Sequence, residues 1–228
     1  MAVVITLDGP AGAGKSTVSR ALARRLSCLY LDTGAMYRAL TVKALDRGIS
    51  MDDPRAIGEL AARTEIRLVP DPDAMRVTVD GEDVTERIRN PEVSRNVSYV
   101  ARVPEVRAEM VRVQRKLGEG GSVVAEGRDM GTVVFPHADL KVYLEASPHE
   151  RARRRASDLA LAGHAVDLEA LEAEIRQRDH LDATRDVAPM AAAADAIRLV
   201  TDDLSADQVV DRILDLLQGG ALAGRTAG

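Results

Sequence analysis

Residues 9–16 read Gly9-Pro10-Ala11-Gly12-Ala13-Gly14-Lys15-Ser16, a complete G-x-x-x-x-G-K-[ST] phosphate-binding loop. The loop follows the apolar run Val3–Leu7, which is typical of a buried strand, and precedes Thr17–Leu26, where apolar residues recur at helical spacing. A strand entering such a loop and a helix leaving it direct backbone N–H groups and the helix dipole at a triphosphate. We therefore predict that Lys15 contacts the β- and γ-phosphates of a nucleotide and that Ser16 holds Mg²⁺.

The composition fits a globular enzyme and argues against two other classes of protein. The chain has 228 residues, 46% of them hydrophobic and 29% charged, which suffices for one α/β core and an insertion. Aromatic residues make up only 2%, so we expect no stacking platform for single-stranded nucleic acid. A formal net charge of −5 argues against general binding of nucleic acids, and no apolar run approaches the roughly 18 residues of a membrane span.

Cysteine and histidine usage points to an intracellular protein without a structural metal. The single cysteine, Cys28, lies in an apolar run, and we interpret it as a buried small hydrophobe rather than a nucleophile. One cysteine cannot form an intrachain disulfide, which suits a reducing cytoplasm, and the first strand begins too early for a removable leader. The histidines are scattered, so we expect no zinc site. We predict a cytoplasmic monomer.

Strand-like runs alternate with helical segments along the chain. The strand-like runs are Val3–Leu7, Cys28–Leu31, Val123–Ala125, Leu140–Leu144 and Ala196–Val200. This βα alternation predicts an α/β fold, in which helices flank a parallel, doubly wound sheet of five strands.

The segment from Thr33 to about Ser122 has a different texture. Ile66–Val69 and Met75–Val79 are short strand-like runs separated by a turn at residues 70–73, which predicts a small antiparallel sheet, and Asp80-Gly81 predicts a second turn. Helices are expected at Pro91–Val100 and Pro104–Leu117, each with proline in its first turn. We predict a core domain at residues 1–33 and 97–218 with a lid at about 148–185, an inserted domain at 34–96, and a disordered tail at 219–228.

A phosphate loop alone fits GTPases, ATPases and kinases. The Asn-Lys-x-Asp sequence that reads guanine is absent, which argues against a GTPase. Arginine instead recurs near predicted strand ends and on predicted helices near them, at Arg38, Arg128, Arg151, Arg154, Arg155, Arg178 and Arg185. The planar guanidinium grips phosphate oxygens in pairs and stays charged, so this distribution favours phosphoryl transfer.

Two motifs follow predicted strands. In residues 32–38, Thr33 is the expected N-cap of a helix, and Arg38, one turn inside, is placed to hold the phosphate of an acceptor; alternatively, the two are only a cap and a solvated side chain. In residues 126–132, two glycines flank Arg128-Asp129 at the carboxyl edge of the sheet, where ligands bind in such folds. A local surface ion pair is the alternative there.

Two predicted helices carry arginine on one face. Residues 147–150 form an expected capping box, and Arg151, Arg154 and Arg155 follow at spacings that share a face. Such a concentration of like charge costs stability unless an anion offsets it, although a solvated basic face is also possible. Arg178, Asp182 and Arg185 share a face in the same way, with an intrahelical ion pair between the first two as the alternative.

Four motifs together resemble the bacterial cytidylate kinases: residues 9–17, 31–38, 126–136 and 178–185. The resemblance spans about residues 3–217 and implies a phosphate-loop NTPase fold similar to adenylate kinase, with an inserted monophosphate-binding domain and a short mobile lid. It further implies transfer of the γ-phosphoryl group of ATP, with Mg²⁺, to CMP or dCMP.

The resemblance also implies roles for individual residues. ATP is expected at Gly9, Pro10, Ala11, Gly12, Ala13, Gly14, Lys15, Ser16 and Thr17. CMP is expected at Thr33, Tyr37, Arg38, Ser98, Arg107, Arg128, Asp129, Arg178 and Asp182. The implied catalytic charges are Lys15, Arg128, Arg151, Arg154, Arg155, Arg178 and Arg185.

The chemistry of cytosine agrees with this assignment. Its N4 amino group donates, so the Asp129 carboxylate and the Ser98 hydroxyl can accept from it while Arg107 donates to N3 or O2. Uracil presents a carbonyl oxygen at that edge, which should disfavour UMP by a few kcal/mol. A kinase for UMP, AMP or a small metabolite, or a nucleotide sensor without turnover, stays open as an alternative. Asp32 and Glu126 are both candidates to support Mg²⁺.

Overall fold

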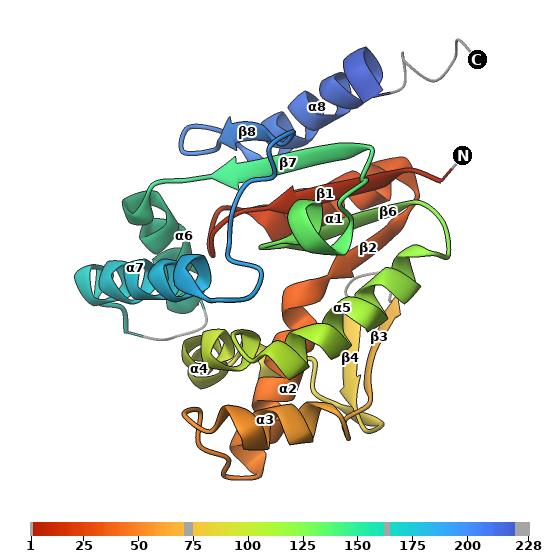
Figure 1. Ribbon diagram of the computed structural model, residues 1–228. Helices are drawn as coiled ribbons and strands as arrows, with labels where there is room; N and C mark the ends of the chain where they lie inside the picture. Colours follow the sequence, from red (N-terminus) through yellow and green to blue (C-terminus); the bar gives the residue numbers. More distant parts are fainter. Residues whose placement is uncertain (1, 71–74, 162–164, 222–228) are drawn as a thin grey trace.

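The computed structural model describes residues 2–70, 75–161 and 165–221. Its larger sheet has five parallel strands in the order β2-β6-β1-β7-β8 (Figure 1). In chain order these are β1 (Val4–Asp8), β2 (Leu29–Asp32), β6 (Val123–Gly127), β7 (Leu140–Glu145) and β8 (Ile197–Val200). The predicted five-stranded parallel sheet is therefore confirmed.

Both faces of this sheet are covered because its strands are apolar on both sides. On one face, Ile5 and Leu7 of β1 pack in a cluster with α1 (Lys15–Leu26) and α8 (Ala206–Leu216). On the other face, β6 packs against the π-helical turn η2 (Met130–Val134). The carboxyl ends of β1 and β6 thus meet at one edge of the sheet, where the phosphate loop begins.

The segment between β2 and β6 contains a second, three-stranded antiparallel sheet, as predicted. The sheet consists of β3 (Ile66–Pro70), β4 (Met75–Val79) and β5 (Glu82–Asp83), and the same segment begins with the helices α2 (Thr33–Asp46) and α3 (Pro54–Ala61). Asp80 and Gly81 have φ angles of 51° and 87°, the left-handed pair that a tight hairpin turn requires. Of the turn predicted at residues 70–73, residues 71–73 lie outside the described part of the chain.

Helix α2 packs on two sides. Ala35 and Ala39 lie in a cluster with Val77 of β4, whereas Met36 and Leu40 pack toward α3 and two later helices. After the 3-10 turn η1 (Arg87–Arg89), those helices are α4 (Pro91–Ala101) and α5 (Pro104–Gly118). α2 leaves the end of β2 and forms the shared support of both groups (Figure 1). The division of the chain into core, insertion and lid stays a prediction.

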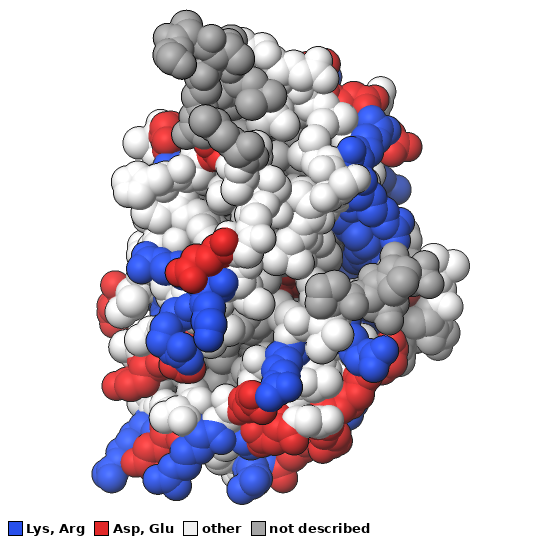
Figure 2. All heavy atoms as spheres, turned by 90° about the vertical axis from the view of Figure 1, so that its right-hand side faces the viewer, with Lys and Arg blue, Asp and Glu red and all other residues white. Residues whose placement is uncertain are grey.

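Helices α6 (Pro148–Leu161) and α7 (Leu168–Thr184) pack against each other through Ala152, Leu171 and Ile175. The chain then forms β8 and α8 and ends, within the described residues, in the π-helical turn η3 (Leu217–Ala221). Residues 222–228 of the predicted tail lie outside those residues. The described helices include none that is long and apolar enough to cross a membrane. Figure 2 shows acidic and basic side chains interspersed over the lower part of one face.

Three local predictions were wrong. Asp32, not Thr33, is the N-cap of α2, because its carboxylate accepts from the Ala35 N–H at 2.9 Å. The capping box at α6 is only half formed: Ser147 accepts from the Glu150 N–H, but the Glu150 carboxylate binds arginines instead of returning to the cap. Cys28 is half-buried rather than buried, at the margin of the core.

Candidate active site

The phosphate loop connects β1 to α1 at the carboxyl edge of the sheet. Gly14 has a φ of 87°, and a Cβ on Gly9 would collide with the carbonyl oxygen of Leu144 in the neighbouring strand β7, so both positions require glycine. Lys15 is buried and donates to the carbonyl oxygens of Gly9 at 2.8 Å and Pro10 at 2.6 Å. Burial lowers the pKa of Lys15, and the charge of Arg128 lowers it further. The lysine is therefore held over the loop, beside a second cation.

Glu126 at the end of β6 lies next to Ser16. Its carboxylate accepts from the Ser16 hydroxyl at 3.0 Å and from the Tyr30 hydroxyl, and burial raises its pKa. Asp32, the other candidate for supporting Mg²⁺, is occupied differently: besides capping α2, it accepts from Arg38 at 2.8 Å. Among the two candidates, only Glu126 contacts the predicted magnesium residue.

The oxygen atoms around Ser16 are suited to a Mg²⁺ ion that enters the site together with a nucleotide. A hydroxyl and a carboxylate within hydrogen-bond distance are the hard donors that this ion prefers, and Mg²⁺ is usually held by one or two such groups plus phosphates. Within the described ranges, no group of three or more His, Cys, Asp or Glu side chains could hold a metal by itself. The residues present therefore fit a metal whose remaining ligands come from phosphate and water.

Residues from four elements converge beyond the loop. Arg107 of α5 forms an ion pair with Asp129, which follows β6, and both side chains are less than 5% exposed. Arg185, after α7, reaches the other Asp129 oxygen at 3.6 Å. Asp182 of α7 accepts from the Ser98 hydroxyl at 2.9 Å and from Arg128 at 3.0 Å. We call this set the acceptor cluster: Ser98, Arg107, Arg128, Asp129, Arg178, Asp182 and Arg185.

Several donors in the acceptor cluster have no hydrogen-bond acceptor within the described residues. They are the Nε atoms of Arg107 and Arg178 and an Nη atom of Arg185, all buried. Burial lowers the pKa of Arg178 to about 10, and the charges of Arg128, Arg38 and Arg155 contribute. Buried guanidiniums that face one another and keep free N–H groups are suited to an anionic ligand with several oxygen atoms. The alternative considered for this face, an intrahelical pair of Arg178 with Asp182, is replaced in the described residues by the Asp182–Arg128 pair.

Tyr37 of α2 lies next to the acceptor cluster, and Thr33 begins the same helix. The guanidinium of Arg107 lies 5.7 Å from the centre of the Tyr37 ring, and the Thr33 hydroxyl donates to the Glu126 carbonyl oxygen at 2.6 Å. The second contact fastens the start of α2 to the end of β6. Arg38, in the same turn, forms an ion pair with Asp32.

The three arginines on the first turns of α6 differ in their contacts. Arg151 is 3% exposed at its side chain and donates to the Ala11 carbonyl oxygen at 3.1 Å and to Asp179 of α7 at 2.6 Å. Arg154 binds Glu150 and the Thr201 carbonyl oxygen. These two side chains connect the phosphate loop and the segment after β8 to α6 and α7. Arg155 lies close enough to Arg178 to lower its pKa.

Sequence reasoning missed Asp8, the last residue of β1. Its buried carboxylate accepts from the backbone N–H groups of Met130 and Gly131, each at 2.8 Å. Asp8 thereby fixes the backbone that carries Arg128 and Asp129. A carboxylate that ends a buried strand directly before a phosphate loop was the available signal.

Burial raises the pKa of Asp8 from 3.8 to about 6. Between these values the folded protein keeps a proton that the unfolded chain has lost, so this group makes stability fall as pH rises from about 4 to about 6. We expect the unfolding free energy of Asp8→Asn, relative to the parent, to improve by about 2 kcal/mol between pH 4.5 and pH 7.5. Urea denaturation at a series of pH values measures this difference. A difference that stays constant with pH contradicts the assignment.

The parallel sheet, the phosphate loop after its central strand and the arginines gathered at its carboxyl edge define a phosphate-loop kinase of the α/β class. The family model described as cytidylate kinase matches residues 5–219. The chain belongs to the cytidylate kinase family, which confirms the resemblance that its motifs show.

Individual relatives agree with this assignment. The chain is 49% identical over 217 residues to a cytidylate kinase of Pelotomaculum thermopropionicum, covering 95% of this chain and 96% of that one. It is 53% identical over 217 residues to a bifunctional pantoate ligase/cytidylate kinase of Synechococcus sp. strain WH7803, with 94% of this chain and 44% of that protein covered. The chain thus spans less than half of such bifunctional relatives. A gluconokinase from Sinorhizobium meliloti 1021, 15% identical with a TM-score of 0.50 and coverage of 97% and 94%, shares the fold.

Proposed function

We propose that this protein transfers the γ-phosphoryl group of ATP to CMP and dCMP by direct in-line displacement. The observation that carries the proposal is the acceptor cluster: buried guanidiniums with free N–H groups and two carboxylates lie together beside the phosphate loop. Such a set can grip a phosphate and read a polar base edge at once. Membership of the cytidylate kinase family supports the same substrates.

The donor nucleotide has a suitable cavity next to the loop. A cavity of about 260 Å³ is bordered by Gly14 and Thr17 of the loop and α1, by Arg154 of α6, and by Thr201 and Leu204 after β8. We place the nucleoside of ATP there, with its phosphates in the loop. Arg151 and Arg154, which already contact loop and rim, would hold this side of the site together.

The acceptor nucleotide is assigned to the cluster. Arg128 and Arg178 would hold the CMP phosphate together with Arg38, whose charge already acts on Arg178. Asp129, Arg107 and Ser98 would read the cytosine, because the Ser98 hydroxyl keeps lone pairs for the N4 amino group while it donates to Asp182. Asp182 would face the ribose.

The chain's own residues supply most of the electrostatics of transfer. Lys15 and the nearby guanidiniums stabilise charge on the transferred group, and the buried setting strengthens each interaction because water is excluded. Mg²⁺, arriving with ATP, would offset the negative charge of the phosphates. Ser16 would bind that ion, and Glu126 would orient it from the Ser16 hydroxyl.

We expect Glu126→Gln to raise the Mg²⁺ concentration for half-maximal activity at least tenfold, because loss of an outer-shell partner typically costs 10–100-fold in metal affinity. The matched control is Asp32→Asn, which removes a neighbouring carboxylate that does not touch Ser16 and should leave the Mg²⁺ requirement within about twofold of the parent. Magnesium titration of the initial rate measures both. Equal shifts in the two variants contradict the role of Glu126.

An ADP-release assay with ATP as donor tests the function itself. CMP, dCMP, UMP, AMP, GMP and shikimate are compared at equal concentration. We expect the highest kcat/KM with CMP and dCMP. Preference for UMP, AMP or shikimate would replace the proposed acceptor, and binding of ATP without turnover on any of them would indicate a sensor. Cytoplasmic location and a monomeric state stay predictions.

A further inference from the structure

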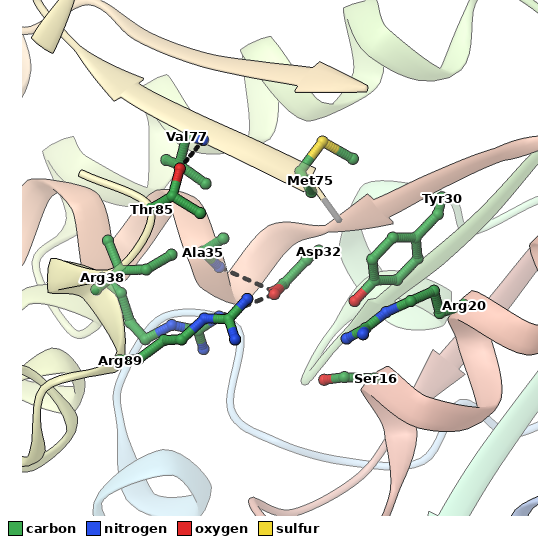
Figure 3. A pocket seen from close by; sticks show the side chains of 11 residues that line it. Ser16, Arg20, Tyr30, Asp32, Ala35, Arg38, Met75, Val77, Thr85 and Arg89 are labelled. Atoms are coloured by element: carbon green, nitrogen blue, oxygen red, sulfur yellow. Dashed lines mark hydrogen bonds and ion pairs between the residues drawn. The ribbon is translucent and has the colours of Figure 1, made fainter. Parts of the chain in front are cut away.

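Tyr30 of β2 lies beside the phosphate loop and has no role in the function proposed above. Its hydroxyl donates to one Glu126 oxygen, while the Ser16 hydroxyl donates to the other at 3.0 Å. In the parallel pair of β2 and β6, Tyr30 lies opposite Val124, two residues before Glu126, so the two side chains share a face of the sheet. Figure 3 shows the hydroxyls of Tyr30 and Ser16 facing the cavity that both residues line. The Glu126 carboxylate is therefore held between two hydroxyl groups.

The residues on either side of this contact are fixed in turn. The guanidinium of Arg20, one turn after Ser16 on α1, lies 5.8 Å from the centre of the Tyr30 ring, within the range of a cation–π contact (Figure 3). The Thr33 hydroxyl donates to the Glu126 carbonyl oxygen at 2.6 Å, and Glu126 is buried. Both the side chain and the backbone of Glu126 are thus fixed by β2 and the start of α2.

The neighbouring carboxylate is held in the same way. Asp32 accepts from the Ala35 N–H with one oxygen and from Arg38 with the other, at 2.9 and 2.8 Å. Each oxygen atom of the two carboxylates considered for Mg²⁺ support therefore has a hydrogen-bond donor. These bonds leave some lone pairs free, but they fix the plane of each carboxylate. Neither carboxylate can turn toward a cation without breaking a hydrogen bond.

Fixed carboxylates favour one kind of divalent cation. Mg²⁺ is small, requires near-octahedral geometry and keeps several of its water molecules, so it gains little from a carboxylate that can turn. Ca²⁺ takes roughly six to eight oxygen ligands in flexible geometry and gains from carboxylates that bind with both oxygens. We propose that Tyr30 is a positioning residue that makes the site select Mg²⁺ over Ca²⁺, because its hydroxyl keeps Glu126 on Ser16 and out of direct contact with the ion.

The variant Tyr30→Phe removes this hydroxyl and leaves the ring beside Arg20. One Glu126 oxygen then loses its donor, and the carboxylate becomes free to turn toward an ion. Ca²⁺ should gain more from a mobile carboxylate than Mg²⁺ does, so the preference for Mg²⁺ should narrow. The proposal rests on the proposed function in one respect, namely that the ion enters with the donor nucleotide.

Calorimetric titration of ADP into the full chain tests the proposal without any acceptor or turnover. The titration is run with excess Mg²⁺, with excess Ca²⁺ and with EDTA. We expect the parent to bind ADP more tightly with Mg²⁺ than with Ca²⁺. Tyr30→Phe should reduce the ratio of these two affinities about fivefold or more, since partners of this kind typically contribute roughly 10–100-fold to metal affinity. Its affinity for ADP in EDTA should stay within about twofold of the parent.

Tyr143→Phe is the matched control. Tyr143 is also a buried tyrosine in a strand of the larger sheet, and Arg198 lies 5.4 Å from the centre of its ring, but its hydroxyl does not bind Glu126. This variant should keep the parental ratio. A double variant tests the route: in Glu126→Gln, adding Tyr30→Phe should change the ratio less than about twofold, because the tyrosine acts only through that carboxylate.

Three results overturn the proposal. The first is a ratio in Tyr30→Phe within about twofold of the parent, and the second is the same narrowing in Tyr143→Phe. The third is an equal loss of ADP affinity with Mg²⁺, Ca²⁺ and EDTA, which would show that Tyr30 only supports the loop. If CMP is no substrate, the proposed acceptor fails, and the calorimetric ratio still decides the role of Tyr30.

Discussion

Lys15→Ala should lower kcat by about 10³-fold and leave the fold intact. Loss of one hydrogen-bond donor that stabilises charge in the transition state typically lowers kcat 10²–10³-fold. Because Lys15 carries a full positive charge at the transferred group, we expect a loss at the upper end of this range. The fold should survive because Lys15 bonds only to two loop carbonyls, and removing a buried cation also removes its desolvation cost. The kcat with CMP and the thermal unfolding temperature are measured on the same preparation.

Lys43→Ala is the matched control for this variant. Lys43 is also a largely buried lysine, but it pairs with Asp80 and Thr64 at the small sheet, far along α2 from the loop. We expect its kcat to stay within about threefold of the parent. Near-parental activity in Lys15→Ala would show that the loop does not hold the transferred phosphate.

Asp129→Asn should lower kcat/KM for CMP more than for UMP, changing their ratio by about 1–3 kcal/mol, or roughly 5–150-fold. An amide in place of the carboxylate can turn its N–H toward the uracil carbonyl, whereas the cytosine amino group loses an anionic acceptor. Asparagine is preferable to alanine because Asp129 also pairs with Arg107 and Arg185. Removing one partner of such a buried pair typically costs about 3–5 kcal/mol of stability.

Arg38→Ala provides the contrast, because it should weaken CMP and UMP alike through the phosphate that they share. Steady-state kinetics with both substrates, and unfolding temperatures for both variants, separate base reading from loss of structure. Equal losses for the two substrates in Asp129→Asn would leave Asp129 only as a partner of Arg107 and Arg185, and the assignment of base reading would have to be abandoned.

The fold was predictable because its signals are local. Each strand of the larger sheet is a short apolar run, and the glycines of residues 9–16 occupy the positions that the loop backbone demands. Local competition between similar residues caused the errors. Asp32 and Thr33 are adjacent and both suit an N-cap, so sequence alone could not rank them, and Glu150 preferred two arginines over the backbone of its own cap.

The sequence predicted which residues belong to the candidate site better than it predicted the contacts between them. Helical spacing correctly placed Asp182 near Arg178, but not its bonds to Ser98 and Arg128, which are 84 and 54 residues away along the chain. Asp8 was missed for the same reason, since the N–H groups that it accepts from lie 122 and 123 residues further on. Spacing along a helix shows which residues share a face. It does not show which residues from distant parts of the chain contact that face.

Helix α2 acts as a lever. Its near end is pinned where Asp32 caps it and Thr33 bonds to the end of β6, and its 14 residues form a rod of about 21 Å. The small sheet grips one flank of this rod, while α4 and α5 grip the other. Because both flanks are packed on one helix that is attached at its near end, we expect α2 to move as a rigid rod that carries the small sheet and the pair α4 and α5 together.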